Sequence, residues 1–380
     1  MFIFDLLIYV FFAWIMYSLA KKSDEIYGEE DNLDGYLWTY MIFFAVISAI
    51  RWRVGTDCNN YIEIFQKGEI RPNSREFLWD ALVRFVKVMD FHFTIGTGIV
   101  AFIQVFLLTY ALKKYKYILI WFPVVLFGGR YFLDIMNGVR QMTVACGFVY
   151  LSTFIFNRQI FKYILGILIL SGIHMSALIL IPFYLVAFIP FDRLDLSNRR
   201  VLWLCVLIVC FFVGRLPAFQ GLINYIEPVL SSTGYEYQST YYRDLLSGKI
   251  TEQLSFGPIM ISYLLLSISV IWFGPVLYER FGQEIKSFNI WYFFSLIYSC
   301  VYFLFCNAGH MMIRPLQYFE LFQAIVLSLL LYLFWSDKEV YRKYLYILVC
   351  IIWVCTAIGV YKASGQVYET VIYKTYFDHI

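Results

Sequence analysis

The chain has 380 residues, of which 61% are hydrophobic and only 15% are charged. Water-soluble domains average about 45–50% apolar and about 25% charged residues, so this composition excludes a single soluble globule and predicts lipid-facing helices. The net charge of +3 is too small to indicate a nucleic acid partner.

The apolar segments predict an all-α, polytopic membrane protein with one domain over residues 1–380. Residues 2–20 lack a basic leader and a convincing cleavage site, so we expect a retained span there. Crossing the hydrocarbon takes about 20 helical residues. This requirement predicts about twelve spans, near 2–20, 36–52, 93–112, 117–133, 139–156, 160–173, 174–190, 201–217, 258–278, 289–306, 312–335 and 343–360. The pair around 160–190 is interpreted either as two short helices that meet at residues 172–174 or as one span plus a re-entrant piece.

Basic residues gather in every alternate connection between the predicted spans. Short basic loops stay in the cytoplasm of bacteria, so this pattern predicts a multi-pass protein of the bacterial cytoplasmic membrane with both termini outside. The basic residues of these six loops are Lys21, Lys22, Lys113, Lys114, Lys116, Arg158, Lys162, Arg193, Arg199, Arg200, Arg280, Lys286, Lys338, Arg342 and Lys343.

Two long segments, 53–93 and 218–257, lie outside in this topology. Apolar residues at helical spacing over 75–88 predict an amphipathic helix on the outer membrane surface. The second segment is rich in tyrosine. Its residues Tyr235, Tyr237, Tyr241 and Tyr242 are interpreted either as platforms for sugar faces or as part of a loop that caps the bundle.

Arg53, Asp57 and Tyr61 follow the second span, directly after Arg51 and Trp52. Arginines on the outer side oppose the orientation rule, which favours an anion site with a carboxylate close by. The structural alternative is that the arginines extend to lipid headgroups and that Asp57 caps a turn.

Arg140 stands in the first turn of the helix predicted to begin near Val139, after a break at Gly138. A cation there opposes the positive end of the helix dipole. The position becomes favourable if an anion is shared between Arg140 and the free N–H groups of the helix end. The alternative is an ion pair with Asp134.

Two further polar groups stand where outer helix ends are predicted. His174 opens the span at 174–190 and is either a satisfied structural residue or, near a polar cleft, a base or phosphate donor. Pro315 suits a first helical turn, so Arg314 precedes an outer helix end as Arg140 does. His310 is expected in the preceding loop.

Together, Arg140, His174 and Arg314 are each predicted at the outer N-terminus of a descending helix, with Arg53 nearby. We therefore expect one anion pocket at the outer interface. Guanidinium groups bind phosphate oxygens well. The predicted ligand is a phosphorylated, lipid-linked molecule whose tail lies in the bilayer.

At these residues the chain resembles the EpsG/Wzy-type family of polysaccharide polymerases, which make capsule, exopolysaccharide and O-antigen chains. The ordered set of motifs is more specific than any one of them, and the resemblance covers roughly the whole chain. The matching pieces are Arg53-Val-Gly-Thr-Asp57-x-x-x-Tyr61, Asn137-Gly-Val-Arg140-Gln141-x-x-x-Ala145, His174-Met-Ser176-Ala177 and Arg314-x-x-x-Tyr318-Phe319.

The resemblance implies a helical glycosyltransferase similar in plan to the membrane C-type enzymes. Such proteins join undecaprenyl-diphosphate-linked oligosaccharide repeat units at the outer face of the cytoplasmic membrane, with undecaprenyl diphosphate as leaving group. No cofactor, metal or nucleotide sugar is expected. The implied partners are the lipid-linked oligosaccharide and membrane lipids, with a flippase and a chain-length regulator as candidate protein partners.

Residue roles follow from this chemistry. Arg53, Arg140 and Arg314 are predicted to bind the diphosphate and stabilise its developing charge. His174 and Asp57 are the candidate bases for the acceptor hydroxyl, with Asp57 alternatively orienting Arg53. Supporting positions are Tyr61, Gln141, His310 and Tyr318.

Two other functions fit a helical membrane protein with outer arginines. A flippase for lipid-linked oligosaccharide usually has two related halves and polar groups through its spans, and the chain contains no internal repeat. A membrane O-acyltransferase of surface glycans should receive acyl groups from inside, whereas the histidines are predicted outside.

Overall fold

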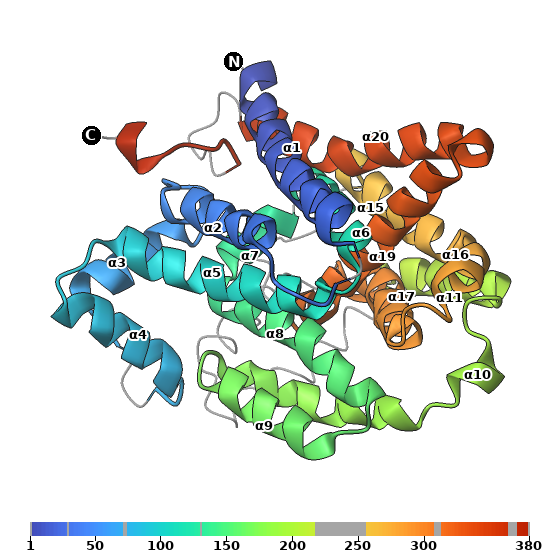
Figure 1. Ribbon diagram of the computed structural model, residues 1–380, viewed down its shortest axis with the longest axis horizontal. Helices are drawn as coiled ribbons and strands as arrows, with labels where there is room; N and C mark the ends of the chain where they lie inside the picture. The colour runs from blue at the N-terminus through green and yellow to red at the C-terminus, as the bar shows by residue number, and fades with distance from the viewer. Residues whose placement is uncertain are drawn as a thin grey trace.

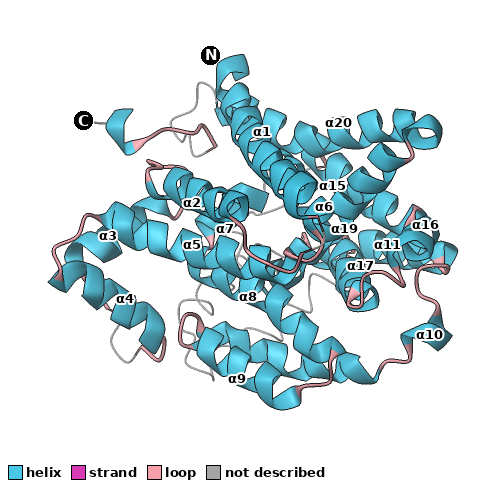
Figure 2. Cartoon of the chain, viewed as in Figure 1, coloured by secondary structure: helices cyan, strands magenta, loops and turns pink. Residues whose placement is uncertain are grey.

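The computed structural model describes residues 2–28, 30–70, 74–129, 131–216, 256–307, 313–363 and 371–378. Regular structure in this part of the chain is helical (Figure 2). The extended backbone pairing within it is an isolated antiparallel bridge between Arg51 and Thr375.

The helices follow the apolar segments of the sequence (Figure 1). The first part of the chain forms α1 (Phe2–Tyr27), α2 (Gly35–Ala49), α3 (Cys58–Lys67), α4 (Phe77–Val88), α5 (Phe93–Leu112), α6 (Lys116–Gly128), α7 (Tyr131–Asn137), α8 (Val139–Phe156) and α9 (Ile160–Ser171). The rest forms the 3-10 helix η1 (Met175–Phe188), α10 (Phe191–Leu194), α11 (Arg200–Val213), α15 (Pro258–Trp272), α16 (Gly274–Phe281), α17 (Phe288–Phe305), η2 (Arg314–Leu316), α19 (Gln317–Ser336), α20 (Lys338–Ala363) and η3 (Tyr376–Asp378).

Within the described residues, six helices are long and apolar enough to cross a membrane, or eight if the bent pairs α6–α7 and α15–α16 each count as one span. The six are α1, α5, α8, α17, α19 and α20. Four shorter apolar helices, α2, α9, η1 and α11, occupy the other predicted spans. A helical membrane protein is therefore confirmed, whereas the number of about twelve spans stays a prediction.

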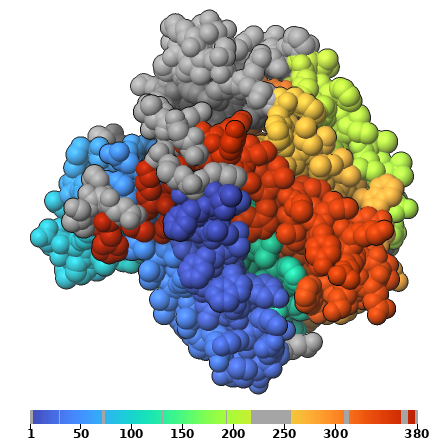
Figure 3. All heavy atoms as spheres, turned by 90° about the horizontal axis from the view of Figure 1, so that it is seen from above, coloured from blue at the N-terminus to red at the C-terminus, as the bar shows by residue number. Residues whose placement is uncertain are grey.

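Helix α19 lies at the centre of the bundle and packs against α6, α8, α17 and α20 (Figure 1). Within its most apolar stretch 83% of the residues are buried, against 33% in α1 and 39% in α20. A helix that is apolar all round belongs in the interior. α1 and α20 lie side by side at the surface (Figure 3), and α1 exposes Phe4, Leu7, Phe11 and Trp14, as lipid contact requires.

Helices α9 and η1 form a hairpin, in which the Tyr163 hydroxyl donates to the Leu180 carbonyl at 2.6 Å. The structure thus contains two short helices that meet at residues 172–174, and whether each crosses the membrane or one of them is re-entrant stays a prediction. The second is a 3-10 helix of 14 residues, which the sequence did not predict. Because a 3-10 helix rises about 2.0 Å per residue, η1 extends about 28 Å, where an α-helix of the same length extends about 21 Å.

The helix predicted at 75–88 is α4, and it forms a pair with α3 at one side of the molecule (Figure 1). The helix is confirmed, but its buried face consists of Trp79, Val83 and Val86, whereas the apolar residues Phe77 and Phe85 are exposed. The position on the outer membrane surface stays a prediction. The pair packs on α5.

Arg51 ties the end of α2 to the end of α7. Its side chain is 3% exposed and donates to the Ser48 carbonyl at 2.6 Å and to the Met136 carbonyl at 3.1 Å. Two backbone carbonyls therefore hold the buried guanidinium between α2 and α7, which gives Arg51 a structural role.

The C-terminal segment, residues 371–378, pairs with the backbone that leads to Arg53. The Trp52 N–H donates to the Lys374 carbonyl at 2.8 Å, and the Tyr376 N–H donates to the Ile50 carbonyl at 2.7 Å. The backbone that precedes Arg53 is therefore held by a segment more than 300 residues away in the chain.

Helix α8 begins beside the middle of α5. The Gln104 amide donates to the Val139 carbonyl at 3.0 Å, and Gln104 is eleven residues into α5 after Phe93. At 1.5 Å per residue, the start of α8 lies about 16 Å along the axis of α5 from the start of α5 at Phe93.

Candidate functional site

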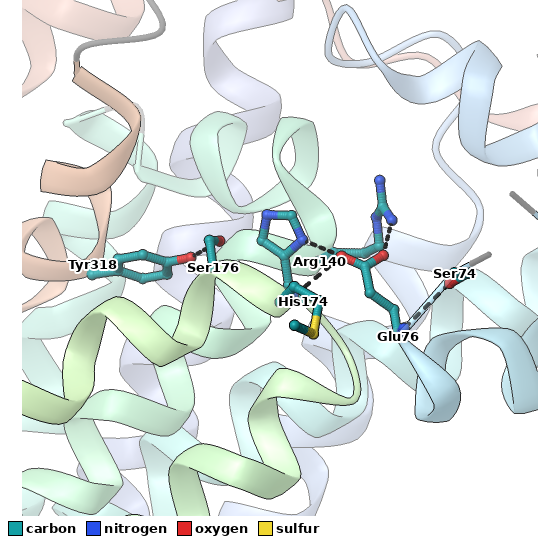
Figure 4. A network of polar contacts seen from close by, with 7 residues as sticks. Ser74, Glu76, Arg140, His174, Ser176 and Tyr318 are labelled. Carbon is teal, nitrogen blue, oxygen red and sulfur yellow. Dashed lines mark hydrogen bonds and ion pairs between the residues drawn. The ribbon is translucent and has the colours of Figure 1, made fainter. Parts of the chain in front are cut away.

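Glu76, Arg140 and His174 form one polar cluster, which we call the Glu76 cluster. One carboxylate oxygen of Glu76 pairs with Arg140 Nη1, and the other lies 2.7 Å from His174 Nδ1 (Figure 4). The Met175 N–H donates to the second oxygen at 3.2 Å. Three elements, the start of α4, the start of α8 and the start of η1, thus meet at a single carboxylate.

A close approach between α4 and the α9–η1 corner brings Glu76 to His174. The Gly172 carbonyl accepts the N–H groups of Leu78 and Trp79 at 2.8 Å and 3.1 Å, which satisfies donors at the start of α4. A Cβ atom at Gly172 would lie 2.6 Å from Phe77 Cε1, so glycine permits this contact. Glu76 is the residue that precedes α4, and its position follows from this docking.

The Glu76 carboxyl is charged in this environment. Its burial favours the neutral acid, but the hydrogen bond from His174, the charge of Arg140 and the Met175 N–H outweigh burial and hold the pKa below its ordinary value. The cluster therefore combines one negative charge, one permanent positive charge and one imidazole. Its side chains are 13% to 26% exposed, so a ligand can reach them.

Arg140 keeps binding capacity beyond its pair with Glu76. Its guanidinium lies 5.4 Å from the centre of the Trp79 ring, which supports the planar group from one side. Its Nε is buried and has no hydrogen-bond partner among the described residues. No side chain caps the start of α8, where Gly138 is the N-cap. An anion here would meet both the guanidinium and unsatisfied N–H groups.

The expected alternative partner of Arg140 was Asp134. In the described part of the chain the ion pair of Arg140 is with Glu76 instead. The reason is the break at Gly138, after which α8 begins with Arg140 beside α4 and the Trp79 ring.

The four sequence motifs meet around the start of α8. Thr56 Oγ1 and the Asp57 N–H both donate to Asn137 Oδ1, at 2.7 Å and 2.9 Å, which joins the first motif to the second. Gln141 Nε2 donates to the Arg314 carbonyl, which joins the second motif to the fourth.

The third and fourth motifs are joined by a hydrogen bond between Ser176 and Tyr318 (Figure 4). Gln141 and Tyr318, which were predicted as supporting positions, each form a hydrogen bond that joins one motif to another. Tyr61 is buried beside them, and its ring lies 5.8 Å from that of Trp79. Burial raises the pKa of the Tyr61 hydroxyl, and the nearby charge of Arg140 opposes this only in part.

Arg53 is exposed, and its guanidinium lies 5.8 Å from the Trp52 ring. Its φ of 57° is a left-handed conformation that arginine rarely adopts. Asp57 occupies the N-cap position of α3, yet its carboxylate makes no capping hydrogen bond. The interpretation of Asp57 as a turn cap is therefore wrong, and its carboxylate is left for other contacts.

Arg314 opens η2 and is half-buried. Its carbonyl accepts Gln141, while its guanidinium forms no ion pair or hydrogen bond within the described residues. His310 and the tyrosines at 235, 237, 241 and 242 lie outside the described residues. The structure thus places Arg140 and His174 together and brings the backbones of the Arg53 and Arg314 motifs to the same helix end.

Glu76 was missed by sequence reasoning, because it reads as an ordinary acidic residue at the start of the amphipathic helix. The signal that could have found it is its position one residue before that helix, where a carboxylate usually caps. Only the packing of α4 on Gly172 shows that the carboxylate is directed elsewhere.

Comparison with protein-family models gives a match to the EpsG family over residues 36–375. Neither the curated proteins nor the solved structures contain a match to this chain.

Proposed function

The chain belongs to the EpsG family of Wzy-type polysaccharide polymerases, and we propose that it joins undecaprenyl-diphosphate-linked oligosaccharide repeat units at the outer face of the bacterial cytoplasmic membrane. Family membership supports a polymerase with glycosyltransferase-type activity in a membrane. The lipid carrier, the face of the membrane and the residue roles are the proposal.

The observation that carries the proposal is the Glu76 cluster. A fixed cation and an imidazole share one carboxylate, and the N-terminus of α8 lies directly beside them. Glycosyl transfer from a diphosphate needs these two capacities together: stabilisation of a leaving anion and removal of a proton.

In the proposed reaction the acceptor hydroxyl oxygen forms a bond to the anomeric carbon of the donor sugar. The bond between that carbon and the diphosphate oxygen breaks, and its electron pair stays with the diphosphate. Undecaprenyl diphosphate leaves with one more negative charge. Arg140 stabilises this charge from the rim of α8, and Arg53 and Arg314 contribute from the two motifs packed against it.

His174 is the proposed base. Its Nδ1 is held by Glu76, which leaves Nε2 for the acceptor hydroxyl. When Nε2 takes the proton, the ring becomes positive beside the charged Glu76 carboxylate and close to Arg140. Positive charge therefore increases at the same moment as negative charge grows on the diphosphate, and the proton then passes to water.

Asp57 is the second candidate base. Its carboxylate is not used as a helix cap, and the same segment carries Arg53. We assign it to orienting Arg53, because the Asp57 backbone is fixed on Asn137 next to α8 while His174 already has a positioned carboxylate. Tyr61, Gln141 and Tyr318 keep the motifs in register, and His310 belongs to the loop before Arg314.

The function is tested in a host strain from which the gene is deleted, with glycan sizing and lipid-linked intermediates as readouts. We expect single repeat units to accumulate on the outer leaflet and long polymer to disappear. Units retained on the inner leaflet would instead identify a flippase. Complementation with His174→Gln should fail, whereas Asp57→Asn should retain measurable polymer; the reverse result exchanges the two roles.

The membrane face is tested by labelling a His174→Cys variant, on a background without native cysteines, with a membrane-impermeant thiol reagent. Labelling in intact spheroplasts supports the outer site. Labelling only from inverted vesicles contradicts it and favours acyl transfer from the cytoplasmic side.

A further inference from the structure

A second site lies on the α3–α4 pair. A cavity of about 270 Å³ is present where the end of α3, the end of α4 and the start of α5 meet. Phe65 and Phe93, each 2% exposed, form its apolar floor, and the exposed side chains Gln66, Asp90 and His92 surround it. The exposed ring of Phe91 completes the wall.

Aromatic rings connect this cavity to the Glu76 cluster. The Phe65 ring lies 5.5 Å from that of Trp79, and the Trp79 ring lies 5.4 Å from the Arg140 guanidinium. The Phe65 ring is therefore within about 11 Å of Arg140. An oligosaccharide of a few residues spans such a distance.

Asp90 occupies a position that favours glycine. It follows α4 with a φ of 50°, and the Phe91 N–H closes the helix end on the Val86 carbonyl at 3.0 Å. Glycine is the usual residue in this left-handed position. Aspartate and asparagine are the non-glycine residues that adopt this conformation most readily, so the turn is compatible with Asp90, whose carboxylate lines the cavity.

The other polar groups are also directed by local contacts. His92 Nδ1 lies 3.0 Å from Thr94 Oγ1, which leaves Nε2 as the group available to a ligand. Lys87 donates to the backbone carbonyl of Gln66 at 2.9 Å, which holds the ammonium group on α3. The side-chain amide of Gln66 has no hydrogen-bond partner among the described residues.

We propose that this cavity is a saccharide subsite, which holds a sugar ring of the growing chain a few residues from the bond being formed. The inference rests on the proposed polymerase function. The exposed Phe91 ring offers a surface for the apolar face of a pyranose. The amide of Gln66, the carboxylate of Asp90 and the imidazole of His92 are groups that bind its hydroxyls. The Asp90 carboxylate and the tied Lys87 disfavour a phosphate in this cavity.

The test uses Asp90→Gly, which removes the carboxylate while placing glycine where the backbone favours it. The matched control is Asp195→Gly, because Asp195 has a φ of 44° at the end of α10, and its carboxylate accepts only Asn198 in the described residues. The probe is a fluorescently labelled oligosaccharide of two repeat units, cut from the host polymer and free of diphosphate. Binding to the purified full-length protein is measured.

We expect binding of the probe to fall about tenfold in Asp90→Gly and in Phe91→Ala, with no change in Asp195→Gly. The thermal midpoint of Asp90→Gly should equal or exceed that of the wild type. Polymer made by Asp90→Gly cells should be shorter, although polymerisation continues.

Unchanged probe binding in both Asp90→Gly and Phe91→Ala overturns the subsite, as does failure of the wild type to bind the probe. Failure of the proposed function is a separate result. It shows as full-length polymer in Arg140→Ala cells, whatever the probe does, because Arg140 is not part of this cavity.

Discussion

Asp34 and Glu76 occupy the same kind of position, the residue before a helix, and use it differently. Asp34 caps α2: one carboxylate oxygen accepts the N–H groups of Tyr36 and Leu37 at 2.9 Å and 3.1 Å. Its other oxygen accepts the Ser23 hydroxyl at 2.5 Å and lies 3.7 Å from Lys116 Nζ. Both members of this ion pair are buried, with side chains 5% and 0% exposed.

Glu76 makes no capping hydrogen bond to α4. The Gly172 carbonyl takes over that task, so the Glu76 carboxylate is free to hold Arg140 and His174. Its cluster is partly exposed and contains more cationic groups than the single carboxylate can neutralise once His174 is protonated.

The difference separates a structural pair from the cluster to which we assign the reaction. At Asp34 every oxygen is used by local donors, so the pair stabilises the α1–α2 turn and offers nothing to a ligand. At Glu76 the helix end is satisfied by a remote carbonyl, and the carboxylate becomes a positioning group for two other side chains.

The largest contrast is expected between Arg140→Ala and Lys116→Met. Removing Arg140 should lower the rate of polymer formation by about 100-fold or more, because one fixed donor to a developing anion is typically worth that much. Lys116→Met should leave the rate within about twofold. Both rates are measured with purified protein and lipid-linked repeat units.

The control for Arg140→Ala is Arg140→Lys, which keeps the charge but loses the planar fork and should recover only part of the rate. Comparable rates for the alanine variant and the wild type would show that Arg140 binds no leaving group.

Glu76→Gln should lower the rate by about 10-fold to 100-fold, since the base and the arginine remain but lose their shared orienting charge. The loss in the double variant Glu76→Gln with His174→Gln should be smaller than the sum of the two single losses, because the part that Glu76 contributes through His174 is already lost. Asp34→Asn provides the comparison and should change stability more than rate. Additive losses in the double variant would place Glu76 outside the proton-transfer step.

Acidification should affect the two carboxylates through stability as well. The folded-state pKa of Glu76 lies below its ordinary value of 4.5, so its contribution is present above pH 4.5 and is lost as the pH falls through the folded-state pKa. The difference in thermal midpoint between wild type and Glu76→Gln should therefore be largest near neutral pH and shrink below about pH 4. A difference that is constant or grows on acidification would contradict the charged state assigned to Glu76.

The sequence predicted the helical membrane fold, the helix α4 and the segments that meet at the start of α8. These features follow from the spacing of apolar residues and from composition, which are properties of short stretches of sequence. It did not predict Glu76 as the partner of Arg140, because the decisive contact is the Gly172 carbonyl on the start of α4, between residues far apart in the chain. It also did not predict the 3-10 geometry of η1, a helix that packs against α9.

Arg53 shows the same limit. Its motif was visible in the sequence, but its left-handed backbone and its support by the C-terminal segment were not, because the pairing joins residues 50–52 to residues 374–376. Asp57 looked like a turn cap and is at an N-cap position without capping. The local sequence pattern identified these residues. The contacts of each side chain depend on tertiary packing, which the local pattern does not contain.

The smallest effect is expected where the chain supports Arg53 from a distance. The Tyr376 ring lies 5.5 Å from that of Trp52 and 4.7 Å from that of His92, so it secures the backbone that precedes Arg53. Tyr376→Ala keeps the backbone pairing but removes this packing. It should lower the polymerisation rate by about twofold to fivefold, mainly by weakening substrate binding. Phe377→Ala, at the neighbouring residue with 68% exposure, is the matched control and should behave as wild type. The same loss in both variants would mean that the C-terminal segment acts on stability in general, while a loss confined to Tyr376→Ala extends the region on which the candidate site depends to the end of the chain.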